Sequence, residues 1–396
     1  MWAGRHVVLG VSGGIASYKS CILARRLAEQ GAWVDVILTE GAAEFVRPLT
    51  FEALTARPVL TSLWQRGAAL EHVRLAQQAD LIVVAPATAH LIARAAQGLG
   101  DDLLTTLLLA ATVPVLLAPA MNDAMFAHAA TQANLQLLKA RGLAVVGPEV
   151  GALAERPSDL PGRMSEPETI LAHAARLLRS RGQLTGKRVL VTAGPTREGL
   201  DPVRVITNRS SGKMGFRLAE AAWERGAEVM LITGPSALPD PVGVTVHRVE
   251  TTSQMAEAVK AALPGADVLV MAAAPADYRP SDAPEAKRSR TEGALALSLL
   301  PTDDILLGSR GVRKKGAVIV GFALETGDAV AKGRAKLQKK DLDLIVVNDA
   351  LEEGAAFEVD TNRVTILDRA GQAVEVPLGS KRAVAEAVLD AVEAQL

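Results

Sequence analysis

The run RLAEQGAWVDVILT at residues 26–39 recurs in altered form as RLAEAAWERGAEVMLIT at residues 217–233. In each copy a helix-forming run ends at a glycine and a β-branched run follows, which is typical of a helix that stops before a buried strand. Another β-branched run and a glycine-containing turn precede each copy, with the runs at Val7–Val11 and Val189–Thr192. Strand, turn, helix and strand form a βαβ unit, so we expect two separately wound α/β sheets.

Further apolar runs predict the remaining strands. They are continuously apolar rather than alternating, as in parallel strands that are covered on both faces. The predicted fold class is therefore α/β, with two doubly wound Rossmann-like parallel sheets and ligands outside the carboxyl ends of the strands. A polar cluster at residues 177–187 separates expected domains at residues 1–180 and 186–396. The predicted strands are residues 81–85, 113–118, 144–146, 245–249, 268–272, 318–322, 344–347 and 363–367.

Composition narrows the class of protein. The chain has 396 residues, a net charge of −1 and 49% hydrophobic residues, as expected for two or three ordinary globular domains without a basic surface for nucleic acid or membranes. The single cysteine, Cys21, excludes a disulfide framework and a multi-cysteine zinc site. The N-terminus lacks the pattern of a signal peptide, and prolines interrupt the longest apolar stretch, residues 103–121. We therefore expect a cytoplasmic protein.

Four polar features mark the first half. The turn Ser12-Gly13-Gly14 would let backbone N–H groups approach a phosphate at a helix start, and Pro86-Ala87-Thr88 offers a second anion contact. Asn122 follows a predicted strand, and His72 precedes another. Taken singly, each has a structural explanation: a tight turn, an N-cap, a turn residue and a structural histidine.

Together, in order and spacing, these features resemble the flavin-containing cysteine decarboxylases, in particular the phosphopantothenoylcysteine decarboxylases, over residues 5–175. The resemblance implies a flavodoxin-like flavoprotein domain that decarboxylates 4′-phosphopantothenoylcysteine to 4′-phosphopantetheine. It also implies that His72 is the active-site base and that Asn122 holds the substrate carboxylate. The residues expected to bind FMN are Ser12, Gly13, Gly14, Thr39, Pro86, Ala87 and Thr88.

The substrate-covering flap departs from this family. The family reads Leu-Ala-Cys-Gly, whereas this chain reads Leu153-Ala154-Glu155-Arg156, so the cysteine that donates a proton in the final reduction is absent. His90 also replaces the usual asparagine. Three outcomes stay open: Glu155 serves as the acid, the reaction ends at the ene-thiol, or the flavin half is a retained scaffold. We favour Glu155 or another flap group as the acid.

The second half carries a denser set of polar residues. Ser210-Ser211-Gly212-Lys213 supplies N–H, hydroxyl and cationic groups suited to a phosphate, although it is not a Walker A loop. After later strands, the small residues 271–273 would admit a flat base, and Asp277 could hold a divalent cation. Phe322 could stack on a base, while Lys336 and Lys340 lie one helical turn apart and could face one polyphosphate.

This half resembles the phosphopantothenate–cysteine ligases over residues 186–396, with the run from Asp201 to Gly215 as its most specific part. The resemblance implies that CTP activates 4′-phosphopantothenate as an acyl-cytidylate, which cysteine then attacks. Asn208 would carry the cytidylate onward, Arg204 would belong to the same site, and Asp277 would bind Mg²⁺. The expected nucleotide-binding residues are Met271, Ala272, Ala273, Asp277, Lys287, Asp303, Asp304, Ile305, Leu306, Phe322, Lys336 and Lys340.

The two resemblances together identify the chain as a member of the bifunctional coenzyme A biosynthesis enzymes. The family implies a homo-oligomer with trimeric contacts through the flavin half, dimeric contacts through the ligase half and sites between subunits. The expected partners are small molecules: 4′-phosphopantothenate, cysteine and CTP. One alternative is an active ligase whose flavoprotein domain mainly drives oligomerisation. A second is an NAD(P)-dependent oxidoreductase, but neither glycine turn matches G-x-G-x-x-G with an acidic residue about 20 positions on.

Overall fold

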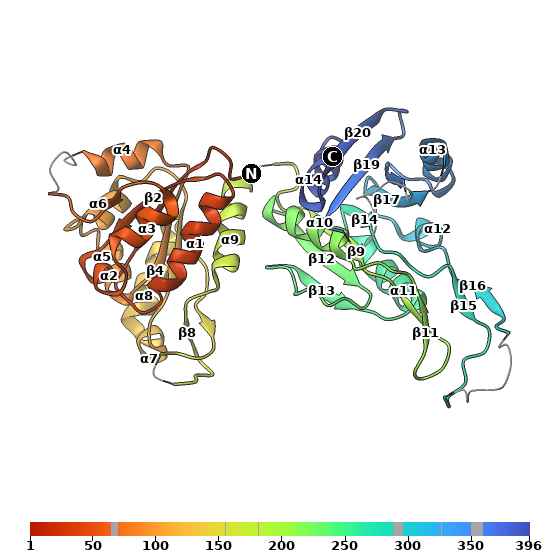
Figure 1. The fold of residues 1–396 in the computed structure, drawn as a ribbon, viewed down its shortest axis with the longest axis horizontal. Helices are drawn as coiled ribbons and strands as arrows, with labels where there is room; N and C mark the ends of the chain where they lie inside the picture. The colour runs from red at the N-terminus through yellow and green to blue at the C-terminus, as the bar shows by residue number, and fades with distance from the viewer. Residues whose placement is uncertain (65–69, 155, 181, 288–295, 326, 350–358) are drawn as a thin grey trace. The chain divides into compact units, whose positions relative to one another are not determined.

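The computed structural model describes residues 1–396 except 65–69, 155, 181, 288–295, 326 and 350–358. The chain divides into two compact units, Met1–Leu178 and Arg179–Leu396. Each unit has its own large sheet with helices packed on it (Figure 1). The predicted α/β class with two doubly wound sheets is confirmed.

The first unit is built on a six-stranded sheet in the order β3-β2-β1-β4-β5-β6. Every pairing is parallel, and the winding direction reverses between β1 and β4. Such a reversal opens a crevice at the carboxyl ends of the strands, where ligands bind. The strands are β1 His6–Val11, β2 Trp33–Leu38, β3 Val59–Leu60, β4 Leu81–Ala87, β5 Val115–Pro119 and β6 Ala144–Val145, with a separate antiparallel pair β7 Glu149–Val150 and β8 Pro161–Arg163.

Helices cover both faces of this sheet. Val7, Leu9 and Val11 of β1 point to the face that α1, α3 and α9 cover, whereas Val8 points to the face covered by α4, α5, α6 and α8. This double burial explains why successive strand positions are mostly apolar, with His6 and Asp35 as buried polar exceptions. The helices are α1 Ser17–Glu29, α2 Glu40–Phe45, α3 Pro48–Thr55, α4 Glu71–Gln78, α5 Ala89–Gln97, α6 Leu103–Ala110, α7 Asp123–Ala127, α8 Ala129–Ala140 and α9 Pro167–Arg179.

The second unit contains an eight-stranded sheet in the order β13-β12-β9-β14-β17-β18-β19-β20. The pairings from β13 to β18 are parallel, whereas β19 pairs antiparallel with both neighbours. The strands are β9 Arg188–Ala193, β12 Glu228–Thr233, β13 Thr245–Arg248, β14 Val268–Met271, β17 Val318–Glu325, β18 Leu344–Asp349, β19 Thr361–Asp368 and β20 Ala373–Ser380.

The prediction that residues 363–367 form another parallel strand is therefore wrong. A four-residue turn joins β19 directly to β20, so no crossover helix is present to make the pairing parallel. Val364, Ile366 and Leu367 are all buried, so burial of an apolar run on both faces does not by itself specify parallel pairing.

Helices and two hairpins complete the second unit. Helices α11, α12 and α13 share one hydrophobic cluster with the sheet. Helices α10 and α14 pack against each other, α10 also on β9 and β12 and α14 also on β19 and β20. The helices are α10 Lys213–Glu224, α11 Thr252–Ala262, α12 Ile305–Gly308, α13 Ala329–Lys340 and α14 Lys381–Glu393, with 3₁₀ turns η1 Leu263–Gly265 and η2 Arg310–Val312. The hairpins pair β10 Arg197–Gly199 with β11 Val205–Thr207 and β15 Tyr278–Pro280 with β16 Leu299–Pro301. Among the described helices, none is both long and apolar enough to cross a bilayer.

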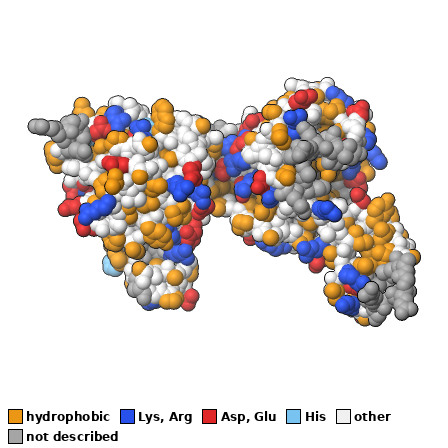
Figure 2. Space-filling view, in the orientation of Figure 1, with side chains coloured by type: hydrophobic (Ala, Val, Ile, Leu, Met, Phe, Trp, Pro, Cys, Tyr) orange, Lys and Arg blue, Asp and Glu red, His pale blue; other side chains and the backbone are white. Residues whose placement is uncertain are grey.

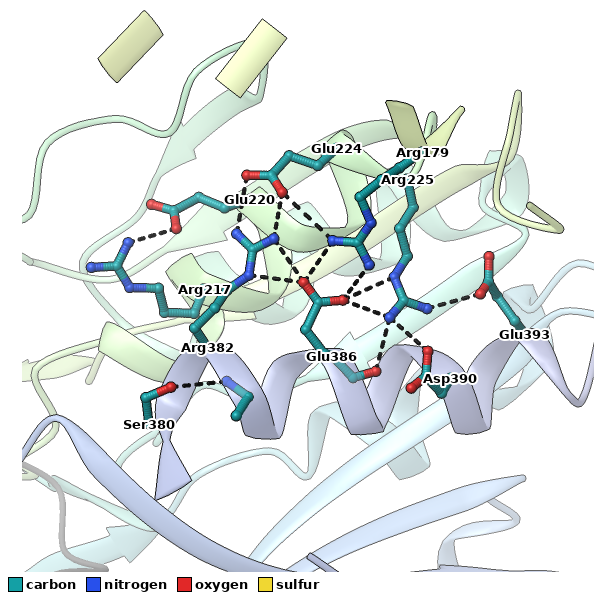
Figure 3. A network of polar contacts seen from close by, with 11 residues as sticks. Arg179, Arg217, Glu220, Glu224, Arg225, Ser380, Arg382, Glu386, Asp390 and Glu393 are labelled. Atoms are coloured by element: carbon teal, nitrogen blue, oxygen red, sulfur yellow. Dashed lines mark hydrogen bonds and ion pairs between the residues drawn. The ribbon is translucent and has the colours of Figure 1, made fainter. Parts of the chain in front are cut away.

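A network of charged side chains fixes α10 against α14 (Figure 3). Glu386 accepts hydrogen bonds from Arg179 at 2.5–2.7 Å, from Arg225 at 2.6 Å and from Arg382 at 2.7 Å. Burial alone would raise the pKa of Glu386, but these guanidinium groups outweigh burial and hold the pKa well below its usual range. The same arginines bind Glu224, Asp390 and Glu393.

Candidate active sites

The first unit has a cavity of about 950 Å³ beside the carboxyl ends of β1, β2, β4 and β5. This volume lies within the range of pockets that hold small molecules and cofactors. The cavity brings together six of the residues that the sequence predicted for this half. They are Ser12, Gly13, Gly14, Thr39, Thr88 and Asn122.

Hydrogen bonds hold the turns that line one end of this cavity. The Ser12 hydroxyl donates to the Pro86 carbonyl at 2.7 Å and accepts from the Thr88 N–H at 3.0 Å, so the turns after β1 and β4 are fixed together. The hydroxyl oxygens of Thr39 and Thr88 cap α2 and α5. A Cβ on Gly13 would lie 2.7 Å from the backbone of Gly41, so only glycine fits there. The result is a polar edge with hydroxyl and N–H groups suited to an anion.

Three predicted residues of this half, Pro86, Ala87 and His72, do not line the cavity. Pro86 and Ala87 are buried within β4, and their carbonyl oxygens accept from the N–H groups of Ser12 and Ala120. His72 lies on α4, and its Nδ1 is buried without a hydrogen-bond partner among the described residues. Glu155 lies outside the described residues. A buried imidazole nitrogen without a partner is costly, so this atom is open to a group outside the described residues.

The cavity also includes residues that the sequence analysis missed. Trp64 follows β3, which has only two residues and is too short to be recognised as a strand run. Lys19 is buried, and its Nζ donates to the Met164 carbonyl and to Glu166, each at 2.9 Å. Its position, about one helical turn beyond the glycine turn, is the sequence feature from which this residue could have been recognised. A buried lysine needs such partners, and here they fix the chain at Met164 and Glu166, where it runs on from the flap.

In the second unit, Asn208 is joined to the loop that follows β14. Its Nδ2 donates to the carbonyl oxygens of Ala274 at 3.1 Å and Pro275 at 3.0 Å. The same loop is tied to the turn after β9, because the Ala276 N–H donates to the Thr196 hydroxyl at 2.8 Å. The segments after β9, β11 and β14 therefore meet, and they carry Asn208, Ala272 and Ala273 of the predicted site.

Asp277 continues this loop and is exposed. The Asp277 carbonyl accepts a hydrogen bond from the Thr302 N–H at 2.9 Å. The predicted residues 303–306 follow Thr302 directly, so this segment begins next to Asp277. Asp304 caps α12 and pairs with Lys340 at 2.9 Å. Burial would raise the pKa of Asp304, but the hydrogen bond from Lys340 and those from backbone N–H groups outweigh burial and lower it. Ile305 and Leu306 are buried and would contact a nucleotide mainly through their backbone.

The two lysines of α13 are each paired with a carboxylate. Lys336 binds Glu325 at the end of β17, and Lys340 binds Asp304 at the start of α12. Lys336 thus lies at the carboxyl end of β17, whose Phe322 is half-buried. Met271 is buried at the end of β14. A nucleotide would compete with these carboxylates for the lysines.

Two predicted cations stand apart from those loops. Lys287 is exposed in the connection between β15 and β16, where it makes no hydrogen bond or ion pair with any residue that the structure describes. Arg204 binds the buried carboxylate of Asp201 with its Nη2 at 2.5 Å, in the turn between β10 and β11. Asn208 and Asp277 are thus connected through the loop after β14, whereas Lys287 lies further along, in the connection between β15 and β16.

The Ser210–Lys213 turn lines a groove of about 1350 Å³ next to the ends of β12 and β13. Lys213 pairs with the exposed Asp360 at 2.7 Å. Gly212 has a φ of +80°, a conformation that favours glycine, and precedes α10 without a side-chain cap. No group of three or more His, Cys, Asp or Glu side chains suited to a metal occurs in the described part of the chain.

Residues 1–179 match the family "Flavoprotein", and residues 184–396 match the family "DNA/pantothenate metabolism flavoprotein C-terminal domain". The chain is 46% identical over 399 residues to the coenzyme A biosynthesis bifunctional protein of Vibrio cholerae, covering 100% of this chain and 99% of that one. The Mycobacterium tuberculosis protein of the same name is 48% identical over 403 residues, covering 98% and 96%. A crystal structure of the C-terminal domain of such a protein is 39% identical, with a TM-score of 0.46, and covers 54% of this chain and 97% of that chain.

Proposed function

The chain belongs to the family of coenzyme A biosynthesis bifunctional proteins, and we propose a division of labour between its two units. As a member of that family it is a ligase and a decarboxylase that acts on small molecules and uses a flavin. In the proposed division, Met1–Leu178 decarboxylates 4′-phosphopantothenoylcysteine with FMN. Arg179–Leu396 condenses 4′-phosphopantothenate with cysteine at the expense of CTP. The ligase step therefore comes first in the pathway although its unit is second in the chain.

The cavity of the first unit supports the FMN assignment. One end offers the Ser12–Gly14 turn and the hydroxyls of Thr39 and Thr88, which suit a phosphate, while Trp64 and Met121 provide apolar walls for a flat ring system. Bound FMN would supply the two-electron oxidation of the substrate thiol that makes loss of CO₂ possible. The protein's own contribution is to orient the substrate and to move protons.

Asn122 is the proposed binder of the substrate carboxylate. It lines the cavity, and its Oδ1 is held at 2.8 Å by the Ala124 N–H, which orients the side-chain amide. His72 is the proposed base, because its buried Nδ1 has no partner within the described residues and can take a proton. Glu155 remains the proposed acid in place of the missing cysteine. Release of the ene-thiol and a scaffold role for this unit are the competing outcomes.

The loop after β14 supports the ligase assignment. Attack of the 4′-phosphopantothenate carboxylate on the α-phosphorus of CTP would release pyrophosphate and give an acyl-cytidylate, which is a far better electrophile than a carboxylate. The cysteine amine would then form the amide, lose a proton and expel CMP. Asn208 already donates from Nδ2 to two carbonyls, so its Oδ1 is the atom that would accept a hydrogen bond from this amine.

Cations would neutralise the triphosphate. Lys287, Lys336 and Lys340 are the proposed contacts, and Arg204 is assigned to the same site. Mg²⁺ prefers oxygen ligands and commonly binds through one carboxylate plus substrate phosphates, which fits the exposed Asp277. The proposed nucleotide contacts of residues 271–273 and 303–306 would come largely from the backbone, because Met271, Ile305 and Leu306 are buried.

We propose that the protein works as a homo-oligomer in the cytoplasm. Figure 2 shows hydrophobic side chains gathered over the β15–β16 hairpin, where Tyr278, Leu299 and Leu300 are 54%, 41% and 44% exposed. Exposed apolar surface of this kind is typical of an interface. A dimer through this unit would let Lys287 complete a partner's site, and a trimer through the flavin unit would give His72 the surroundings that one chain lacks.

One reaction tests the proposal as a whole. The purified protein is incubated with 4′-phosphopantothenate, cysteine, CTP and Mg²⁺, and each species is followed by mass spectrometry. We expect CMP, pyrophosphate, CO₂ and 4′-phosphopantetheine in equal amounts. Accumulation of 4′-phosphopantothenoylcysteine would reject the decarboxylase assignment alone, whereas absence of that compound together with intact CTP would reject the ligase assignment.

A further inference from the structure

Asp123 is a buried carboxylate directly beside Asn122, which lines the flavin-unit cavity, and the proposed reaction scheme gives it no role. It directly follows Asn122 and begins α7, with a side chain that is 2% exposed. The Ser158 hydroxyl donates to its Oδ2 at 2.5 Å, and Arg156 Nη2 donates to the two oxygens at 2.9 and 3.1 Å. A buried carboxylate is costly unless it is paired in this way, so the partners are held tightly.

Both partners come from the flap rather than from the sheet. Leu153 and Ala154 line the cavity, and the Leu153 N–H donates to the Arg156 carbonyl at 2.9 Å. Ser158 is itself buried and accepts from the Leu160 N–H at 3.2 Å. The chain on either side of these two partners is therefore folded onto the carboxylate of Asp123.

The far end of the flap is held independently of Asp123. The Met121 N–H donates to the Gly162 carbonyl at 3.0 Å, and a Cβ on Gly162 would lie only 2.6 Å from the Met121 carbonyl oxygen. Lys19 binds the Met164 carbonyl. Contacts to backbone groups thus fix the end of the flap at Gly162 and Met164, whereas the ion pair with Asp123 fixes its earlier part at Arg156.

We propose that Asp123 is a positioning residue of the decarboxylase site, and this rests on the function proposed above for the flavin unit. Through Arg156 and Ser158 it holds Leu153 and Ala154 at the cavity that Asn122 also lines. The flap and the substrate carboxylate that Asn122 is proposed to bind would then face the same cavity. The charge-assisted hydrogen bonds to Arg156 are stronger than neutral ones, and burial of the carboxylate strengthens them further.

The pairing also explains a departure noted in the sequence. The decarboxylases that this half resembles have Cys-Gly where this chain has Glu155-Arg156. Here Arg156 supplies the guanidinium that pairs with Asp123. The altered flap therefore brings its own attachment to the residue next to Asn122. Hydrogen bonding from Ser158, partly opposed by burial, lowers the pKa of Asp123, so the carboxylate stays charged at neutral pH.

The test compares Asp123→Asn with Asp159→Asn in the full-length, FMN-loaded protein. Asp159 lies in the same flap, is exposed and makes no hydrogen bond or ion pair with a described residue, so its substitution removes the same charge without the contact. For Asp123→Asn we expect the kcat of decarboxylation of 4′-phosphopantothenoylcysteine to fall about tenfold, with a smaller change in KM because Asn122 is intact. Thermolysin should also cut faster between residues 152 and 160, as located by mass spectrometry.

Flavin content and ligase activity of each variant report on folding. Unchanged kcat and unchanged cleavage in Asp123→Asn, or equal effects in Asp159→Asn, would overturn the proposal. If Asp123→Asn loses its flavin, Arg156→Gln decides instead, since it keeps the buried carboxylate: normal turnover and normal cleavage would then refute the role. If the wild-type protein releases no CO₂, the proposed decarboxylase function fails, while the cleavage comparison still decides whether Asp123 holds the flap.

Discussion

The Nδ2 atom of Asn208 donates a hydrogen bond to the carbonyl oxygen of Pro275 at 3.0 Å, although the two residues lie 67 positions apart in the chain. The bond joins the turn after β11 to the loop after β14. It holds the amide nitrogen of Asn208 against the loop, so the Oδ1 atom is the part of the side chain that a ligand can contact.

Substitution Asn208→Ala removes both hydrogen bonds to the loop and the oxygen proposed to accept from the cysteine amine. We expect activation by CTP to continue while amide formation slows about 100-fold, because a group that acts mainly in the transition state is lost. The acyl-cytidylate should then accumulate and be detected by mass spectrometry after rapid quenching. Decarboxylation by the same protein is the internal control. Normal ligation without accumulation would contradict the role of Asn208.

Substitution Lys287→Ala should weaken nucleotide use. Loss of one charge-assisted contact to a phosphate costs about 1.5–3 kcal/mol, so we expect the KM for CTP to rise at least tenfold. The matched control is Lys315→Ala, which removes an equally exposed lysine from outside the predicted site. Initial rates of pyrophosphate release over a range of CTP concentrations measure both. Equal KM values for the two variants would show that Lys287 does not reach the nucleotide, in one chain or across an interface.

Asp35 should make the flavin unit sensitive to acid. It is buried on β2, where His6 Nε2 lies 2.5 Å from Oδ2 and Arg57 Nε lies 2.6 Å from Oδ1. Burial raises the pKa of Asp35, but the hydrogen bonds from His6 and Arg57 outweigh it and lower the pKa to about 2 from the ordinary 3.8. Since the folded pKa is depressed, the stabilisation is complete above pH 3.8 and is lost as the pH falls towards 2.

The size of this contribution is about 2 kcal/mol in the free energy of unfolding. Calorimetry of wild type and Asp35→Asn at neutral pH and near pH 3 measures it. We expect the gap between the two unfolding free energies of the flavin unit to narrow as the pH falls. Asp159→Asn, an exposed carboxylate, should show no such dependence. A gap that stays constant down to pH 2 would rule out this source of acid sensitivity.

Glu386 should be the main stabilising member of the network in Figure 3. Its removal by Glu386→Ala leaves Arg179, Arg225 and Arg382 close together without their shared carboxylate. Arg225 is only 6% exposed, so we expect the unfolding free energy of the ligase unit to fall by about 3–5 kcal/mol. Glu220, whose partner Arg217 is 52% exposed, provides the control, and Glu220→Ala should cost at most about 1 kcal/mol. Similar losses from both would refute a special role for Glu386.

Most of the fold could be predicted from hydrophobic runs and glycine turns, because long buried parallel strands carry a strong local signal. The predicted strand at 81–85 became β4, Leu81–Ala87, and that at 318–322 became β17, Val318–Glu325. The two-residue strand β6 was predicted as residues 144–146, but β3 was not predicted and the antiparallel direction of β19 was missed. β3 has two residues, and the antiparallel β19–β20 pair depends on a turn and on neighbours far away in the sequence rather than on local composition.

The candidate sites could be predicted only where a residue follows a strand closely. Ser12, Thr39 and Thr88 follow their strands at once and Asn122 follows within three residues, and the structure gathers all four around one cavity. Lys19 and Asp123 were not foreseen, because their importance comes from partners more than 30 positions away. Conversely, the pairing of Lys336 with Glu325 and of Lys340 with Asp304 could not be anticipated from helical spacing alone.

Among the described residues, two hydrophobic clusters lie wholly within the first unit, and the cluster shared by α11, α12 and α13 lies wholly within the second. Each unit therefore has a core of its own. Two alleles of the gene, one impaired in each half, should accordingly complement each other when expressed in the same cell and restore growth without added pantethine.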